Sequence, residues 1–167
     1  MICDFLNALL LYVVPFFKDW AWPIVAGIFT GIVTAKMVTY QQAIATAAAS
    51  MVNFATLALC QTYDDARDDS RAAHRELSKI ALALTCQRHV QASEQLSKIA
   101  TGVKIEIDAI LEANQSVFAR RSPQGVQELA AKLSYCANRW AKEVAVIRTR
   151  LRDFINPFPI PRGEMKP

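Results

Sequence analysis

Residues 20–40 read WAWPIVAGIFTGIVTAKMVTY, in which Lys36 is the single charged residue. At 1.5 Å per residue, a helix of this length covers about 30 Å, the thickness of the hydrocarbon core of a bilayer. Trp20 and Trp22 stand at one end and Tyr40 at the other, and aromatic rings favour the headgroup region at such ends. The sequence therefore predicts a transmembrane helix over residues 20–40. The alternative is a buried core helix of a soluble protein.

The segment before this helix is also apolar. Residues 5–17 are mostly Leu, Val and Phe, but they are too few to cross a bilayer. No basic stretch precedes them and no small-residue cleavage site follows them, so we expect the segment to be retained rather than removed as a signal peptide. The pattern favours a helix that lies in the membrane interface, with its polar residues facing the headgroups. We assign residues 1–19 to this interfacial segment.

A stripe of small residues runs along the predicted membrane helix. Gly27 and Gly31 begin it, and Ala35 and Thr39 continue it at four-residue spacing. Small side chains on one face allow two membrane helices to approach closely. We therefore expect this stripe to pack against a second copy of the chain or against another membrane protein. The alternative is a chance pattern, because Gly is frequent in membrane helices.

No charge follows Lys36 until Asp64, and residues 41–63 are rich in Ala, Thr, Ser, Gln and Asn. Apolar residues recur here at the spacing of a helix–helix seam, namely at Ile44, Ala47, Met51, Phe54 and Ala58. We expect one continuous helix that leaves the membrane. The alternative is a second spanning helix over residues 43–60, although its amide and hydroxyl side chains make insertion unfavourable.

The rest of the chain is charged and helical in pattern. Only two of the 19 Lys and Arg residues and two of the 15 Asp and Glu residues precede residue 64. Apolar residues then recur at steps of three and four, which is typical of amphipathic helices. The chain is also rich in Ala, has five Gly and seven Pro, and shows no alternating strand pattern. The sequence predicts an all-α fold.

Residues 120–125 read RRSPQG and form the clearest break within this region. Ser122 suits the N-cap of a new helix, and Pro123 suits its first turn. Apolar residues at helical spacing follow from Val126 to Leu151. We therefore expect residues 64–155 to form a long-helix antiparallel bundle or a coiled-coil-like hairpin, followed by a Pro-rich tail at 156–167.

Basic residues gather near the end of the last predicted helix, at Arg139, Lys142, Arg148, Arg150 and Arg152. They form a candidate surface for an anionic partner, such as an anionic lipid. The simpler interpretation is a solvated face whose cations complement the helix dipole. Nucleic acid is not expected, because the last three Arg residues do not share one helix face and no aromatic residues alternate with them.

The sequence carries no pattern typical of catalysis or metal binding. Its cysteines, at positions 3, 60, 86 and 136, have neither the spacing of a zinc site nor that of a disulfide framework. Cys86 and His89 fit one helix face but lack further ligands at workable spacing. No Gly-rich phosphate loop or nucleophile elbow is present. We expect no enzymatic activity, no metal and no cofactor.

Together these features predict a membrane-anchored, oligomeric helical interaction or scaffold protein. One alternative is a homo-oligomeric pore or membrane-disrupting effector in which residues 20–60 form the conduit. Another is a single-pass protein with extracytoplasmic helices, which resembles phage inner-membrane spanins in layout alone. Lys18 and Lys36 flank the membrane helix and nearly balance the positive-inside rule. The unpaired cysteines and the basic distal region favour the cell (inner) membrane, with the C-terminal domain in the cytoplasm.

Overall fold

The computed structural model describes residues 15, 19, 21–149 and 154, and it contains helices and turns but no strand within them. The all-α prediction is therefore confirmed for this part of the chain. Most of the predicted interfacial segment, Trp20, Arg150, Arg152 and the Pro-rich tail lie outside the described residues. The chain divides into two compact units, Met1–Val38 and Thr39–Pro167.

Helix α2 (Trp22–Ser50) supplies the described helical part of the first unit and also enters the second. Pro23 lies in its first turn, where the absence of an N–H leaves no helical hydrogen bond unmade. Within the described residues, one helical stretch is long and apolar enough to cross a membrane, and it extends from Trp22 to Leu59. Its most apolar window has no buried residue.

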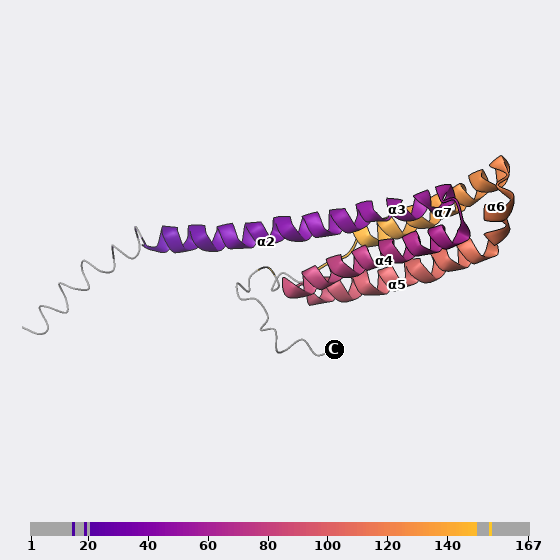
Figure 1. Cartoon of the computed structure of the whole chain (residues 1–167). Coiled ribbons are helices and arrows are strands. Elements are labelled where there is room, and N and C mark those ends of the chain that lie inside the picture. Colours follow the sequence, from indigo (N-terminus) through magenta and orange to yellow (C-terminus); the bar gives the residue numbers. More distant parts are fainter. Residues whose placement is uncertain (1–14, 16–18, 20, 150–153, 155–167) are drawn as a thin grey trace, which may run out of the picture. The chain divides into compact units, whose positions relative to one another are not determined.

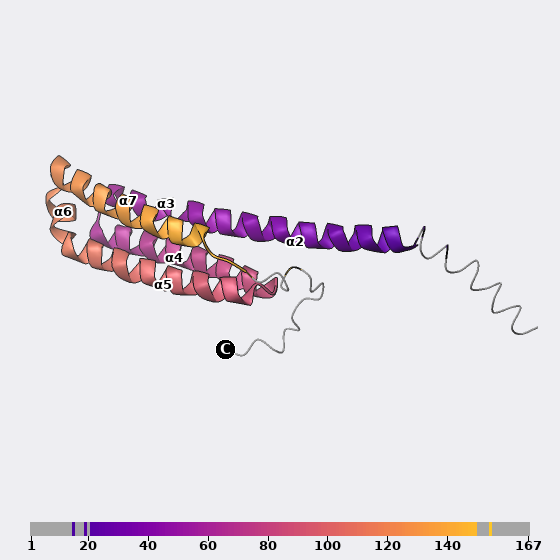
Figure 2. The same ribbon diagram turned by 180° about the vertical axis from the view of Figure 1, so that it is seen from behind.

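The second unit is a helical bundle, as predicted. Helix α4 packs along α5, α5 packs along α7, and α7 packs along α3 and the adjoining 3₁₀ helix η2 (Figures 1 and 2). The long helices alternate in direction, as in an up-and-down bundle. The bounds of these elements are α3 (Val52–Ala55), η2 (Thr56–Leu59), α4 (Tyr63–Cys86), α5 (Val90–Ala113), α6 (Gln115–Arg120) and α7 (Pro123–Ala145).

Leucine and alanine build most of the bundle core. The buried alanines of α4 and α5 let these two helices approach closely, and larger side chains fill the space between them. Buried residues on these two helices include Ala66, Ala73, Leu77, Ala81, Leu84, Ala92, Leu96, Ala100, Val103 and Ile107. The core thus combines small and large apolar residues.

The seam predicted before residue 60 lies inside this core. Ile44, Ala47, Met51, Phe54 and Ala58 are all buried. The backbone, however, is not one uninterrupted α-helix, because α2 ends at Ser50 and α3 and η2 follow a turn at Met51. The hydroxyls of Ser50 and Thr56 donate to carbonyls three residues earlier, which satisfies these polar groups within the helix.

Side-chain caps fix where two bundle helices begin. Thr62 and Asp65 form a capping box at the start of α4, in which each side chain bonds the other residue's backbone N–H. Ser122 accepts a hydrogen bond from the Gly125 N–H and Pro123 occupies the first turn of α7. The capping that RRSPQG predicts is therefore present.

The last helix is shorter than its periodicity predicts. Helix α7 ends at Ala145, and the described residues 146–149 lie outside any helix. The carbonyl of Ile147 accepts a hydrogen bond from the Tyr40 hydroxyl, and the hydroxyl of Thr149 lies 3.2 Å from Nδ1 of His89. Tertiary hydrogen bonds thus occupy backbone and side-chain groups just beyond the helix end.

Candidate functional site

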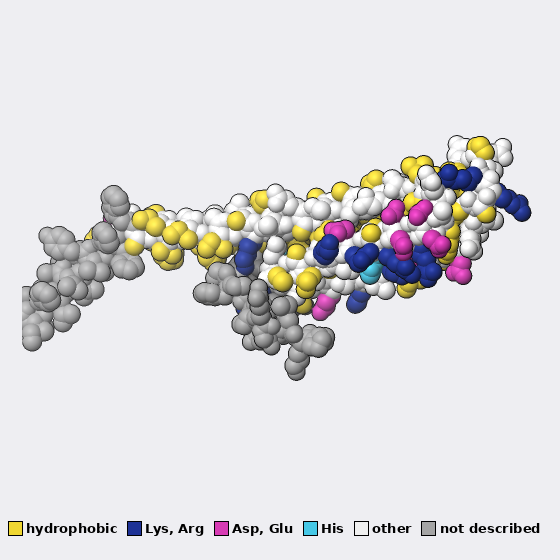
Figure 3. Space-filling model, in the orientation of Figure 1, with side chains coloured by type: hydrophobic (Ala, Val, Ile, Leu, Met, Phe, Trp, Pro, Cys, Tyr) yellow, Lys and Arg dark blue, Asp and Glu magenta, His cyan; other side chains and the backbone are white. Residues whose placement is uncertain are grey.

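The apolar side chains of the first unit are exposed. Ile28 is 61% exposed and Phe29 is 46% exposed. The same holds for Trp22, Ile24, Val25, Ile32, Met37 and Val38. Figure 3 shows hydrophobic side chains along this part of α2. Exposed apolar side chains on one helix form a candidate surface for contact with lipid or with another protein.

The small-residue stripe on this helix has open space around it. A Cβ atom added to Gly27 or to Gly31 meets no heavy atom within 4 Å. Ala35 and Thr39 are also exposed. The stripe is therefore accessible to a second helix.

Two of the residues predicted to be aromatic anchors, Trp22 and Tyr40, are described and lie in different settings. Trp22 is 69% exposed. Tyr40 instead belongs to the bundle, where it is half-buried and its hydroxyl donates to the Ile147 carbonyl at 2.8 Å. The sequence pattern did not reveal this internal role, because a tyrosine after an apolar run suits both settings.

Tyr40 is part of an aromatic cluster around His89. The ring of His89 is fully buried, and its centroid lies 5.0 Å from that of Tyr40 and 5.0 Å from that of Phe154. His89 lies directly after Arg88, whose φ of 68° makes the tight turn between α4 and α5. Residues 87–91 read QRHVQ, where the apolar spacing of the neighbouring helices is interrupted.

The basic surface predicted near the C-terminal end is only partly assembled. Arg139 and Lys142 lie on α7, whereas Arg148 lies beyond its end. Arg139 forms an ion pair with Glu106 of α5, and the same carboxylate oxygen accepts a hydrogen bond from Trp140 Nε1 at 2.7 Å. The Arg139 charge is thus already matched within the bundle, while Lys142 and Arg148 are exposed.

Two cysteines of the bundle, Cys60 and Cys136, are free thiols that resist ionisation. Burial, followed by a hydrogen bond to Asp69 and its negative charge, raises the pKa of Cys60 to about 11. Burial and the charge of Glu106 raise the pKa of Cys136 to about 11 as well. These environments are opposite to those of nucleophilic cysteines. Among the described residues, no group of three metal-binding side chains is close enough to hold an ion.

Two pockets flank α4. One, of about 300 Å³, lies between η2 and α4 and is lined by Asn53, Thr56, Leu57, Asp69, Ala72, Ala73 and Glu76. The other, of about 550 Å³, lies between α4 and α5 and is lined by Asp68, Arg71, His74, Arg75 and Lys104. We call this second one the basic pocket. Figure 3 shows Lys and Arg side chains gathered over α4 and α5.

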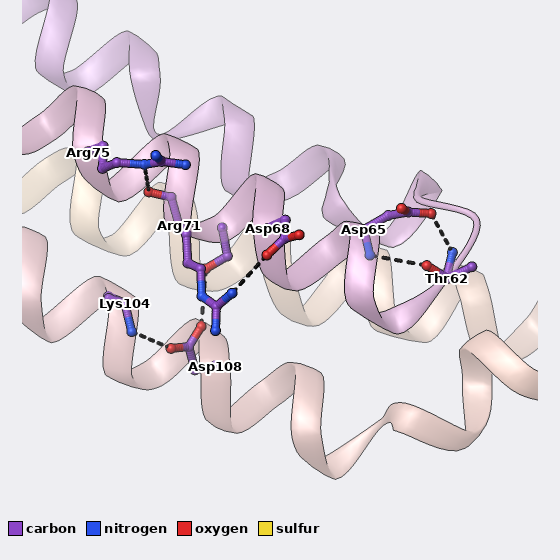
Figure 4. A network of polar contacts seen from close by, with 8 residues as sticks. Thr62, Asp65, Asp68, Arg71, Arg75, Lys104 and Asp108 are labelled. Carbon is purple, nitrogen blue, oxygen red and sulfur yellow. Dashed lines mark hydrogen bonds and ion pairs between the residues drawn. The ribbon is translucent and has the colours of Figure 1, made fainter.

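Ion pairs and hydrogen bonds hold the side chains of the basic pocket (Figure 4). Arg71 pairs with Asp68 at 2.8 Å on α4, and Lys104 pairs with Asp108 at 2.7 Å on α5. The Arg75 Nε donates to the Arg71 carbonyl at 3.4 Å. Sequence reasoning missed this pocket, although basic residues recur every four positions along α4, at Arg67, Arg71, Arg75 and Lys79.

Comparison with known proteins does not assign this chain to a family. No protein-family model, curated protein or solved structure matches this chain. Its function has to be inferred from its own sequence and geometry.

Proposed function

We propose that this protein is a membrane-anchored helical interaction module. In this proposal residues 22–38 cross the bilayer, and the bundle of the second unit binds a partner outside the hydrocarbon core. The observation that carries the proposal is the exposure of apolar side chains around most of the circumference of the first part of α2. The absence of an enzymatic activity is part of the same proposal.

Lipid covers the exposed apolar side chains of such a helix more completely than a protein partner does. At 100° per residue, the exposed side chains spread over about 260° of the helix circumference. They are those of Ile24, Val25, Ile28, Phe29, Met37 and Val38. A neighbouring protein covers one side, whereas lipid covers every side. Burying each such side chain is worth about 1.5–3 kcal/mol, so insertion of the segment gains on the order of 10 kcal/mol.

The length of the segment also suits a bilayer. From Trp22 to Val38 the helix covers about 25 Å, close to the hydrocarbon thickness of about 30 Å. Lys36 lies near the end of the segment, from where a lysine reaches the headgroups with its charge while its methylenes stay in lipid. Trp22 then lies near the opposite interface.

Packing of the second unit favours a module over a pore. Ile44, Met51 and Phe54 are buried in the bundle. A conduit formed by residues 20–60 needs the same segment to leave that core, which exposes these side chains. We therefore prefer the anchored bundle, with self-association through the open Gly27 and Gly31 face as part of the proposal.

A charge-insertion experiment tests the anchor. The double variant Ile28→Lys/Ile32→Lys places two ammonium groups in the proposed membrane segment, at about 2.5–3.5 kcal/mol each. Its matched control is Leu82→Lys/Ile105→Lys, at bundle positions with exposed fractions of 59% and 65%. Flotation after an alkaline wash separates inserted protein from aggregates. We expect the wild type and the control variant to float with the membranes. We expect the Ile28→Lys/Ile32→Lys variant not to float. Recovery of the wild type in the soluble fraction would contradict the proposal.

We further propose that the second unit lies in the cytoplasm. Free thiols at Cys60, Cys86 and Cys136 suit a reducing compartment, and Cys86 is exposed. In a Cys3→Ser/Cys60→Ser variant, a membrane-impermeant maleimide should label Cys86 in inside-out vesicles and not in right-side-out vesicles. The reverse labelling would place the bundle outside the cytoplasm.

A further inference from the structure

We infer that the basic pocket between α4 and α5 binds a phosphate group. The pocket joins permanent positive charge from two helices, with Arg71 and Arg75 on α4 and Lys104 on α5. His74, which is half-buried, adds an imidazole to the same lining. The inference rests on the second unit alone and does not depend on membrane insertion.

The two carboxylates near the pocket, Asp68 and Asp108, pair with two of its three permanent cations and leave one positive charge unmatched. Asp68 is the single acidic residue in the lining and pairs with Arg71, and both of these side chains are about half or more exposed. Exposed ion pairs of this kind are weak and readily exchange partners. Arg75 forms no ion pair within the described part of the chain, so its positive charge is left for a ligand.

Hydrogen bonds and an ion pair within the bundle hold Lys104 and Arg75 in position at the pocket before a ligand binds. Ser70 is fully buried and donates to Oδ1 of Asp108 at 3.1 Å, while Lys104 holds Oδ2 of the same carboxylate. Asp108 thereby fixes Lys104 at the pocket. The Nε of Arg75 is directed to the Arg71 carbonyl, which leaves the two terminal nitrogens to form a pair of parallel hydrogen bonds. A tetrahedral phosphate matches this combination of a planar fork and a point charge.

The pocket volume of about 550 Å³ accommodates more than an inorganic ion. Two sources supply the same chemistry, namely a soluble phosphorylated molecule and the headgroup of an anionic phospholipid. The probes for them are inorganic pyrophosphate and dihexanoyl phosphatidic acid, titrated calorimetrically into the full-length protein in a neutral detergent. Dihexanoyl phosphatidylcholine serves as the zwitterionic comparison.

The pocket variant is Arg75→Gln/Lys104→Gln, and the control Arg120→Gln/Lys132→Gln removes the same charge at exposed positions on α6 and α7. We expect the pocket variant to weaken binding at least tenfold and the control to retain it within about twofold at 50 mM salt. Arg75→Gln alone keeps the Lys104–Asp108 pair intact, so it reports on binding even if the double variant unfolds.

Either probe alone can support the inference. Pyrophosphate binding that depends on Arg75 indicates a soluble ligand, whereas binding of phosphatidic acid alone, with the same dependence, indicates a headgroup. Absence of binding to both probes would overturn the inference. An equal loss of affinity in the pocket variants and in the control would also overturn the inference. Such a result would show that the probes are attracted only by the net charge of the protein.

Discussion

The hydroxyl of Tyr40 donates a hydrogen bond to the backbone carbonyl of Ile147, 2.8 Å away and 107 positions later in the chain. Tyr40 directly follows the first residue of the second unit, and Ile147 follows the end of α7. This contact joins the two ends of the bundle sequence. The ring of Tyr40 also packs on His89, so that the α4–α5 turn belongs to the same cluster.

Replacing Tyr40 with Phe should destabilise the bundle by about 1 kcal/mol, because the Ile147 carbonyl loses its partner in a half-buried site. Urea unfolding in detergent, followed by circular dichroism, measures this change. Tyr135→Phe is the control, since Tyr135 is 73% exposed and we expect no shift there. An unchanged midpoint in Tyr40→Phe would show that the hydrogen bond contributes nothing to stability.

Gly102→Ala should lower the stability of the bundle. An added Cβ lies 2.8 Å from Cη2 of Trp140, whose indole N–H is held by Glu106. Overpacking costs about 1–3 kcal/mol, against a gain of about 1 kcal/mol in helix propensity. Thermal unfolding should therefore occur at a lower temperature than in the wild type. Gly27→Ala, with open space at its Cβ, should not lower it. A more stable Gly102→Ala variant would mean that the indole moves aside freely.

Cys60 should become more reactive in Asp69→Asn. With a pKa of about 11, roughly one Cys60 thiol in a thousand is ionised at pH 8. Removing the Asp69 charge lowers this pKa, so the thiolate fraction and the rate of maleimide addition rise at fixed pH. Burial remains the largest cause of the shift, so the pKa stays above its ordinary value.

The rate is measured in a Cys3→Ser/Cys86→Ser background, in which Cys136 stays buried. Asp68→Asn is the matched control, because Asp68 pairs with Arg71 and does not contact Cys60. Equal acceleration in both variants would assign the effect to net charge rather than to the Asp69 contact.

Leucine at both Gly27 and Gly31 should dissociate the proposed oligomer. Bulky side chains prevent the close approach that a small-residue face allows. The mass of the full-length protein in detergent measures this, and Val25→Leu/Phe29→Leu alters the opposite face as a control. We expect the control to retain the wild-type mass. An oligomer that persists in the glycine variant would place assembly elsewhere.

The sequence by itself determined the class of the fold and the positions of several elements. The apolar period placed Ile44, Met51 and Phe54 on one buried face, and Ser122 with Pro123 set the start of α7. These signals are local, since a helical period and a cap depend on residues within a few turns. The apolar run of α2 is equally local, and it predicted the segment that is exposed here.

The tertiary structure alone decided which element packs against each apolar helix face. It placed Tyr40 against Ile147 rather than leaving it at the free end of the predicted membrane helix, and it ended α7 at Ala145. It also brought Lys104 and Arg75 into the lining of one pocket. Helical periodicity states which side of a helix is apolar but not which helix covers it, because that choice depends on contacts between residues far apart in the sequence.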